Sequence, residues 1–386
     1  MISSDNVIRD TQSLVRIDSQ NPGPLEAACA DWVEQRLLAA DIKVQRQPVA
    51  EGRDNLVAVV PGNPDAPRLV LLAHLDTVPV GAGWTRDPFG GEIADGRIYG
   101  RGTCDMKGGL ALAINVLETL SKNPLPNVGD VVLVATVDEE APGMLGAHAL
   151  VASGFLRPDD QVLAPEPTGM RLRIAQMGLR WITVRIHGRM AHAGRAHLGI
   201  DANHLLAEIV SRLKVTFAGM DVEDPLLGKP RFTCGTFTGG VATNVVPPTA
   251  EANLDLRIVP PMTIDDLELL VREHVDAVLA EHPGATADIE MLGAARPPVR
   301  AAEDAKIVRL LRSSYQAHTG TELPSGGADG HEAYTDASMV ATLTGSSSCT
   351  VFGPGATDQA HTADEFVPLA DLVLGTQVLW SMLEAW

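Results

Sequence analysis

The stretch APRLVLLAHLDTVPV, residues 66–80, decides the fold. It is apolar over many consecutive positions and then ends in polar and turn residues, which is typical of a central strand buried on both faces of an α/β sheet. Two later stretches, DVVLVATVD at 130–138 and DQVLAPEPT at 160–168, have the same character. Helical spacing at 107–121 predicts a helix between the first two of these strands. The alternation of strands and helices predicts an α/β fold with a mainly parallel sheet.

The pattern of apolar and polar residues changes near Gln176. The segment that follows holds strand-like runs with alternating polarity and two helical runs, DANHLLAEIVSRLKV and TIDDLELLVREHVDAVLAEH. This combination predicts a smaller α+β domain inserted at 177–291. The main domain is therefore expected to consist of two parts, 1–176 and 292–386.

The chain has an excess of acid, with 30 lysine and arginine residues against 49 aspartate and glutamate residues and a formal net charge of -19. Such a surface repels phosphate backbones and anionic lipids, which argues against nucleic-acid and membrane partners. The cysteines Cys29, Cys104, Cys234 and Cys349 form no CxxC pair, which excludes a disulfide framework and favours a reducing compartment. Neither a signal peptide nor an apolar run of ~18 residues is visible. We therefore expect a soluble, cytoplasmic protein.

Acids and histidines stand where the predicted strands end, and open α/β sheets bind ligands beyond the carboxyl ends of their strands. The candidate metal ligands are His74, Asp105, Glu140, Glu166 and His361. Imidazole and carboxylate are the usual mixture of zinc ligands, but a catalytic ion keeps one position open. Three carboxylates and two histidines are too many for one such ion. They suit two ions if one carboxylate bridges.

Two further acids adjoin these candidates. Asp76 lies two residues after His74 and is expected to accept the other ring N–H, which would fix the tautomer of the imidazole. Glu139 precedes Glu140 and points elsewhere. It would leave a free carboxylate beside the metals, able to take a proton from water.

The motifs HLDTVP, GRGTCDMKGG, DEE, EPT and GPGATDQAHTADEF occur in this order over both halves of the chain. Together they resemble the dinuclear-zinc metallopeptidase and deacylase family of acetylornithine deacetylase, succinyl-diaminopimelate desuccinylase and carboxypeptidase G. The resemblance implies that Asp105 bridges two zinc ions. His74 and Glu166 would hold one ion, and Glu140 and His361 would hold the other.

The same resemblance implies that Glu139 is the general base and later the general acid. It also implies a cis peptide bond after the bridging aspartate, between Asp105 and Met106. The ligand types equally suit cobalt or manganese, so the native metal stays open between zinc and these two.

The inserted segment resembles the ferredoxin-like lid and dimerisation domain of that family. His192, in GRMAHAGRAHLGIDAN, takes the position of the histidine that polarises the scissile carbonyl, from the same chain or from a partner. Asn244 and Arg257 match positions that contact the substrate carboxylate or the transition state, and a guanidinium pairs well with a carboxylate. The resemblance thus implies a homodimer formed through this domain.

We therefore expect a metal-dependent hydrolase of the amide bond in N-acyl amino acids or small peptides. A ureido-hydrolase or an aminopeptidase on the same scaffold is the alternative, followed by a catalytically inactive metal-binding protein. One loop departs from the family pattern, because Gly326–Gly330 reads GGADG where a hydroxyl residue is usual.

Overall fold

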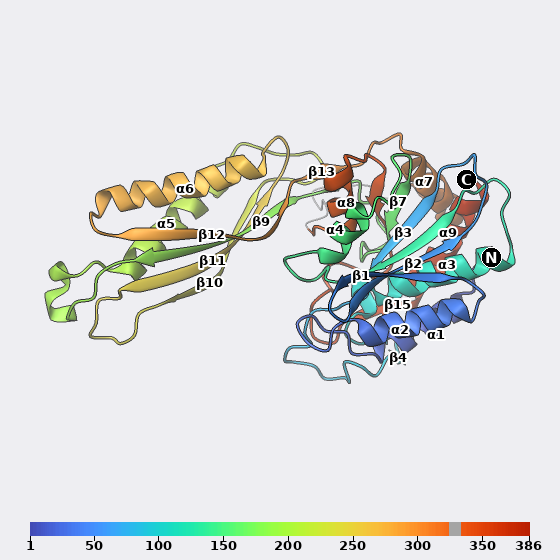
Figure 1. Cartoon of the computed structure of the whole chain (residues 1–386), viewed down its shortest axis with the longest axis horizontal. Coiled ribbons are helices and arrows are strands. Elements are labelled where there is room, and N and C mark those ends of the chain that lie inside the picture. Colours follow the sequence, from blue (N-terminus) through green and yellow to red (C-terminus); the bar gives the residue numbers. More distant parts are fainter. Residues whose placement is uncertain (324–332) are drawn as a thin grey trace. The chain divides into compact units, whose positions relative to one another are not determined.

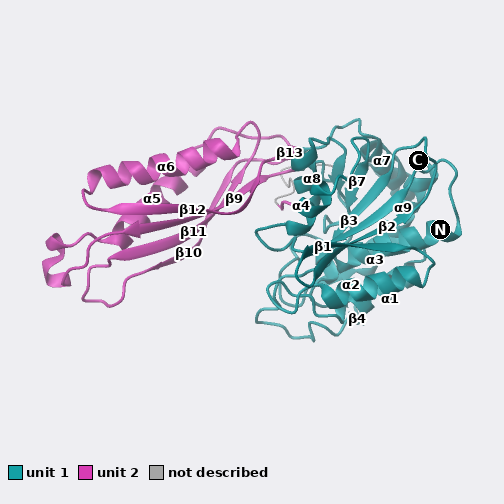
Figure 2. Ribbon diagram, viewed as in Figure 1, with its two compact units in different colours: residues 1–175, 300–326, 335–386 teal, residues 176–299, 327–334 magenta. Residues whose placement is uncertain are grey.

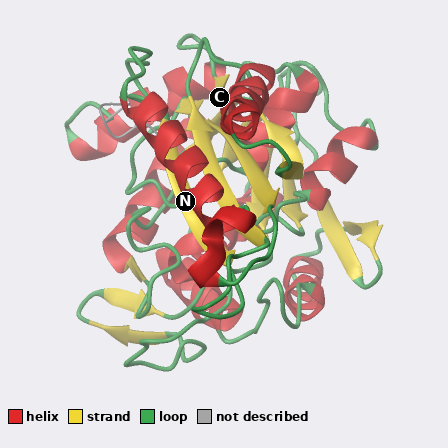
Figure 3. Ribbon diagram, turned by 90° about the vertical axis from the view of Figure 1, so that its left-hand side faces the viewer, coloured by secondary structure: helices red, strands yellow, loops and turns green. Residues whose placement is uncertain are grey.

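The computed structural model describes residues 1–323 and 333–386, and these fall into two compact units (Figure 2). Among the described residues, unit 1 consists of 1–175, 300–323 and 335–386, and unit 2 of 176–299 and 333–334. Helices and strands alternate along the chain, so the fold is mixed α/β (Figure 3). Among the described residues, none of the helices combines the length and the apolar character that crossing a bilayer requires.

The central sheet of unit 1 has six strands, and four of them run parallel to one another (Figure 1). In spatial order they are β1 (Val44–Ala50), β2 (Arg53–Val60), β6 (Val131–Thr136), β3 (Leu69–His74), β7 (Gln161–Ala164) and β14 (Cys349–Val351). Every residue of β3, β6 and β7 is buried, as expected for strands covered on both faces. The antiparallel pair β1 and β2 forms one edge. The predicted mainly parallel sheet is confirmed.

Helices surround this sheet and support the loops at its carboxyl edge. Helix α3 packs against β2, β3 and β6, and α1 and α9 pack against α3. The helices of unit 1 are α1 (Ser4–Val15), α2 (Ala27–Leu38), η1 (Thr103–Lys107), α3 (Gly108–Lys122), α4 (Leu145–Ala152), α7 (Lys306–Thr319), α8 (Asp336–Thr344) and α9 (Leu369–Glu384). The smaller strands are β15 (Phe366–Pro368), β5 (Arg97–Tyr99) and β4 (Glu92–Ala94), which form a three-stranded sheet, and the paired β8 (Ala175–Gln176) and β13 (Val299–Arg300).

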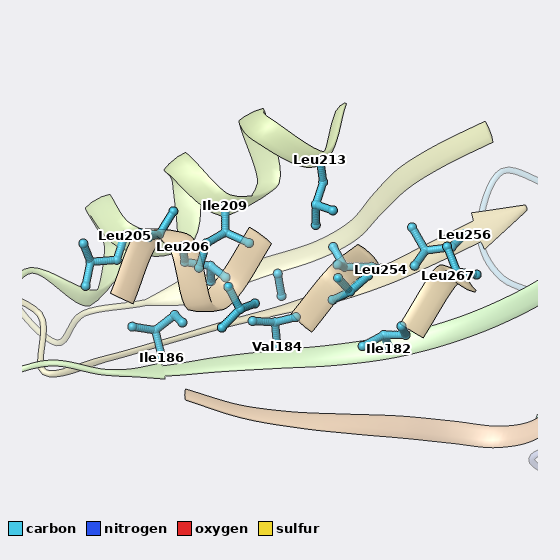
Figure 4. Close-up of a cluster of buried hydrophobic side chains, with 14 of the residues drawn as sticks. Ile182, Val184, Ile186, Leu205, Leu206, Ile209, Leu213, Leu254, Leu256 and Leu267 are labelled. Atoms are coloured by element: carbon cyan, nitrogen blue, oxygen red, sulfur yellow. The ribbon is translucent and has the colours of Figure 1, made fainter. Parts of the chain in front are cut away.

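Unit 2 is a four-stranded antiparallel sheet with helices packed on it, and its core lies between them (Figure 4). Its elements along the chain are β9 (Gly178–His187), η2 (Ala193–Leu198), α5 (Ala202–Ala218), β10 (Arg231–Gly239), β11 (Thr249–Ile258), α6 (Ile264–Glu281) and β12 (Thr286–Arg296). The spatial strand order is β10-β11-β9-β12. A β-α-β-β-α-β succession of this kind is ferredoxin-like, as expected.

Alternation along the strands of unit 2 explains its two-layer build. In β11 every second residue from Ala250 to Ile258 is buried, and these side chains meet the apolar stripes of α5 and α6. Helix α6 begins in a capping box, in which the Thr263 hydroxyl accepts the Asp266 backbone N–H and the Asp266 carboxylate accepts the Thr263 N–H.

The predicted inner boundary at residue 291 falls within β12. The strand continues to Arg296, which pairs with Leu179 after a register shift that begins at Leu292. Gly293, with φ of 65°, lies in this irregular stretch. The irregularity at Gly293 therefore interrupts one strand without ending it, and unit 2 runs on to Val299.

Candidate metal centre

Five segments of the chain bring the predicted ligands together at one edge of the sheet of unit 1. His74 is the last residue of β3, Glu140 follows β6, Glu166 follows β7, and His361 lies between β14 and β15. Asp105 lies in η1, directly before α3. Because β3, β6, β7 and β14 are parallel, their carboxyl ends share this edge.

The five side chains form two groups that share one carboxylate. In the first group, Nε2 of His74 lies 3.0 Å from Oδ1 of Asp105 and 3.8 Å from Oε2 of Glu166. In the second, Nε2 of His361 lies 3.3 Å from Oδ2 of Asp105 and 3.2 Å from Oε1 of Glu140. The ligand atoms within each group all lie within 4.8 Å of one another. The two oxygens of Asp105 thus face two different histidines, as a bridging carboxylate requires.

Each group offers one imidazole nitrogen and two carboxylates, a donor set that suits a divalent ion such as zinc. The donor set therefore fits two ions with one shared ligand. Three of the acids and both histidines come from loops far apart in the chain, so their convergence is a property of the fold and not of a local sequence motif.

The charged side chains of the site shift one another's pKa values. Burial opposes a charge on His74, but Glu166 and Asp105 outweigh burial and raise the pKa of this imidazole well above its usual value. In the same way Asp105 and Glu140 raise the pKa of His361 to about 11 against the effect of burial. Burial raises the pKa of Glu166 well above the ordinary range; His74 lowers it, but Asp105 adds to the effect of burial. The site is a concentration of negative charge that attracts cations.

Glu139 lies among these charges. Burial raises its pKa well above the ordinary value, His74 acts in the opposite direction, and Glu166 and Glu140 raise the pKa further. Its own backbone N–H donates to Oδ1 of Asp76 at 3.3 Å. A carboxyl group in this setting holds a proton more readily than a surface glutamate does.

Asp76 is fully buried next to His74, and both its carbonyl oxygen and its carboxylate face the imidazole ring. Nδ1 of His74 lies 2.9 Å from the backbone carbonyl oxygen of Asp76 and 3.5 Å from its carboxylate, so the carbonyl is the acceptor of the ring N–H. The carboxylate accepts instead the backbone N–H groups of Glu139 and Glu140. Asp76 thereby ties the loop after β3 to the loop after β6. The backbone carbonyl still leaves Nε2 as the nitrogen that faces the ligand group.

Close packing explains the glycines that flank Asp105. A Cβ atom on Gly109 would lie 1.9 Å from the carbonyl oxygen of Pro165, the residue before Glu166. The start of α3 therefore lies directly against the loop that carries Glu166, and only glycine permits this approach. The peptide bond between Asp105 and Met106 is cis, as the family resemblance implied.

Glu365 is a residue of the site that the sequence reasoning missed. It is buried, and its Oε1 accepts the backbone N–H of Cys104 at 2.8 Å and of Asp105 at 3.1 Å. Its Oε2 forms an ion pair with the buried Arg101, which also donates to the carbonyl oxygen of Val80. Glu365 stands within the motif GPGATDQAHTADEF, four residues after His361. Its position in this motif could have identified it from the sequence.

The three predicted substrate contacts belong to unit 2. His192 is exposed and caps η2, where its Nδ1 accepts the N–H of Gly194 at 3.0 Å. Asn244 is its neighbour, because its carbonyl oxygen accepts the N–H of Ala193 at 2.9 Å. A cavity of about 520 Å³ lies beside them in unit 2, and its lining includes Ala193, Asp201, Asn203, Thr243 and Val245.

Arg257 is engaged within its own strand. Its Nε and its terminal NH2 group donate to the two carboxylate oxygens of Asp255 at 2.7 and 2.9 Å. The guanidinium thus already has a bidentate carboxylate partner, which the sequence reasoning did not foresee. The predicted departure at Gly326–Gly330 lies outside the described residues.

Comparisons with known proteins identify the family of the chain. Residues 70–385 match the profile described as "Peptidase family M20/M25/M40". The chain is 30% identical over 363 residues to an acetylornithine deacetylase of Proteus mirabilis (strain HI4320), an alignment that covers 92% of this chain and 88% of the relative. It is 31% identical over 356 residues to an acetylornithine deacetylase of Klebsiella pneumoniae (strain 342), covering 88% and 84%.

Solved structures share the fold at lower identity. A tripeptidase from Staphylococcus aureus subsp. aureus Mu50 superposes with a TM-score of 0.80 at 23% identity, covering 100% of this chain and 99% of that one. A metallo-carboxypeptidase from Sulfolobus solfataricus superposes with a TM-score of 0.81 at 20% identity, covering 98% and 99%. The chain therefore belongs to peptidase family M20/M25/M40, and it is a metal-dependent hydrolase that acts on the amide C–N bonds of N-acyl amino acids or small peptides.

Proposed function

We propose that the enzyme works with two zinc ions, which share Asp105, and that it removes the acyl group from an N-acyl amino acid. The observation that carries this proposal is the position of the two Asp105 oxygens, 3.0 and 3.3 Å from two different histidines. His74 and Glu166 would complete one site, and Glu140 and His361 the other. Cobalt or manganese would suit the same ligands. When bound, such ions supply Lewis acidity, which acidifies water and polarises the substrate carbonyl.

Glu139 is the proton carrier in this proposal. It takes a proton from the attacking water and gives it to the departing nitrogen, so that the amine leaves in a neutral form. Its burial beside Glu140 and Glu166 supports this role, because these surroundings raise the pKa of its carboxyl group. A base that is too acidic would not keep the proton until the C–N bond breaks.

His192 is proposed to donate a hydrogen bond to the carbonyl oxygen as negative charge develops there. The contact with Gly194 supports this role. Since Nδ1 accepts the Gly194 N–H, the proton of a neutral ring sits on Nε2, which is then a hydrogen-bond donor. Asn244 lies next to His192 through the Ala193 contact, which supports a joint role in holding the substrate. Arg257 would have to exchange Asp255 for a substrate carboxylate, so we propose it only as a secondary anchor.

A homodimer formed through unit 2, the lid of this proposal, would let His192 serve a partner's site. Strand β10 supports this idea, because it is an edge strand and is exposed along much of its length. Light scattering coupled to gel filtration tests the dimer, and a monomer at all concentrations would contradict it. The four cysteines are free, and three of them are buried, which supports a reducing cytoplasmic location.

A substrate panel tests the proposed function. It should contain N-acetyl amino acids, among them N-acetylornithine because the curated relatives are acetylornithine deacetylases, together with dipeptides, tripeptides and N-carbamoyl amino acids. We expect hydrolysis of N-acyl substrates that stops with a chelator and returns with Zn²⁺ or Co²⁺. Preference for N-carbamoyl substrates would favour the ureido-hydrolase, and preference for free-amine peptides the aminopeptidase. Inactivity on every class would favour a catalytically inactive metal-binding protein.

A further inference from the structure

The segment SQNPGP between α1 and α2 looks like a simple break in the sequence, yet it carries a buried polar residue next to the metal centre. Asn21 is 8% exposed. Its backbone N–H donates to the carbonyl oxygen of Thr77 at 2.8 Å, and Gln20 forms an isolated parallel bridge with Thr77. The backbone thus fixes Asn21 beside the loop that follows β3.

The side chain of Asn21 joins two carboxylates from two different loops. Its Nδ2 donates to Oδ2 of Asp76 at 2.9 Å and to Oδ1 of Asp138 at 3.1 Å. Both aspartates are buried, and like charges this close repel each other. An amide NH2 group has two donors and no charge of its own, so it holds the two acids together. An ionised aspartate has a similar size but no hydrogen-bond donor, so it cannot bind both carboxylates in this way.

Both partners of Asn21 control the acids of the site. The Asp76 carboxylate accepts the backbone N–H groups of Glu139 and Glu140, and its carbonyl oxygen orients His74. Asp138 is the residue directly before Glu139.

Asp138 itself is held in an unusual conformation. It has a positive φ of 67°, which a non-glycine residue adopts only when its surroundings hold it there. Its carboxylate also pairs with Arg53 at 2.8 Å, and its backbone N–H donates to Glu26. Asn21 is the neutral donor in this set of buried charges.

We propose that Asn21 is a positioning residue for the metal-dependent reaction: it sets the angle between the loop that presents His74 and the loop that presents Glu139 and Glu140. The inference rests on the proposed roles of these three residues. Removal of its Nδ2 donor would release the Asp138 turn and let the two aspartates move apart. The proposed general base and one proposed metal ligand would then shift together, although the side chain of Asn21 acts on them only through Asp76 and Asp138.

Three substitutions separate donation from packing. Asn21→Ala removes the side chain, Asn21→Asp keeps the shape but replaces the donor by an acceptor, and Asn21→Ser is a milder change that decides the matter if the first two fail to fold. The matched control is Asn115→Ala. Asn115 is also buried and its Nδ2 also donates to an aspartate, Asp10 at 2.8 Å, but its partners belong to α1 and α3.

Two readouts are needed, turnover and the visible absorption spectrum of the Co²⁺-loaded protein, which reports ligand geometry without any substrate. We expect Asn21→Ala to lower kcat about 10- to 100-fold, the usual range for residues behind metal ligands, with KM changed less than about threefold. The Co²⁺ spectrum should change as well. Asn21→Asp should be at least as severe as Asn21→Ala, and Asn115→Ala should leave both readouts as in wild type.

The proposal is overturned if Asn21→Ala matches Asn115→Ala in kcat and in the Co²⁺ spectrum, or if Asn21→Asp behaves like wild type, since packing alone would then explain the residue. If Asn21→Ala and Asn21→Asp fail to fold, an unchanged Co²⁺ spectrum and unchanged turnover for Asn21→Ser overturn the proposal too. Failure of the proposed function looks different, because wild type itself would hydrolyse no member of the substrate panel while the Co²⁺ spectra still compare the variants.

Discussion

Replacement of Glu365 by glutamine removes one charge from a fully enclosed ion pair and little else. Oε1 of Glu365 accepts the backbone N–H groups of Cys104 and Asp105, whereas Oε2 faces Arg101. A glutamine whose carbonyl oxygen takes the place of Oε1 keeps both backbone contacts. Its NH2 group then points at the guanidinium, where two donors oppose each other. The substitution therefore isolates the ion pair with Arg101.

The expected loss follows from burial. The side chains of Arg101 and Glu365 are 2% and 1% exposed, so the remaining positive charge has no access to water. Removal of one partner from a buried pair costs about 3–5 kcal/mol of unfolding free energy. For a unit of about 250 residues, 1 kcal/mol corresponds to about 2–4 °C in Tm, so the expected drop is about 6–20 °C. Because the ion pair with Arg101 no longer fixes the side chain that accepts the Asp105 N–H, turnover should fall as well.

Thermal unfolding of four proteins tests this reasoning: wild type, Glu365→Gln, Arg101→Met and the double variant. The Tm of the double variant should be closer to that of wild type than the Tm of either single variant, because no unpaired buried charge remains. Asp160→Asn is the matched control, because Asp160 forms a buried ion pair with Arg68 just before β7 begins. This substitution should lower Tm without altering the Co²⁺ spectrum. A Tm drop below about 2 °C for Glu365→Gln, or no recovery in the double variant, refutes the argument.

Glu139→Gln should lower kcat by about 10²- to 10⁴-fold while the metal content stays at the wild-type level, because general-base assistance is lost and no ligand is removed. Turnover assays paired with elemental analysis measure both quantities, and wild-type turnover would exclude Glu139 as the base. His192→Ala should lower kcat more than it raises KM, since its hydrogen bond strengthens as charge develops, and steady-state kinetics showing the opposite pattern would point to substrate binding alone. Zn²⁺ binding near pH 7 should release protons. The neighbouring carboxylates raise the pKa of His74 and bring the pKa of His361 to about 11, so both rings are protonated in the metal-free site. Each ring must lose a proton before it can bind the metal. Release should diminish as pH rises toward that value; calorimetry in buffers of different ionisation enthalpy measures it, and proton uptake at pH 7 would contradict the assignment.

The parts of the fold with strong periodic patterns were predictable from the sequence. The apolar runs at 69–74 and 131–136 are fully buried strands, and the polar residues that end such runs converge because parallel strands share a carboxyl edge. The helix expected at 107–121 is α3, Gly108–Lys122. The resemblance then supplied the pairing of ligands, which spacing alone had left open.

Contacts between distant residues were not predictable. Asn21 lies 55 residues from Asp76 and 117 from Asp138, and nothing in its local sequence shows that its amide joins them. Arg257 finds its carboxylate two positions away, at Asp255, because alternate residues of a strand share one face. The choice between the carbonyl and the carboxylate of Asp76 as partner of His74 depends on ångström-scale geometry that no sequence pattern reports.

The wide separation of the ligands along the chain sets the order of events when the protein is made. Glu140 and His361 belong to one ligand group but are 221 residues apart. At about 5–20 residues per second, a ribosome needs about 10–45 s to synthesise that interval. Throughout it Glu140 lacks His361, and β14, the edge strand next to β7, is made only near the end of the interval. Metal cannot bind to this second group before His361 has been made, whereas the ligands of the first group are all present once Glu166 has been made.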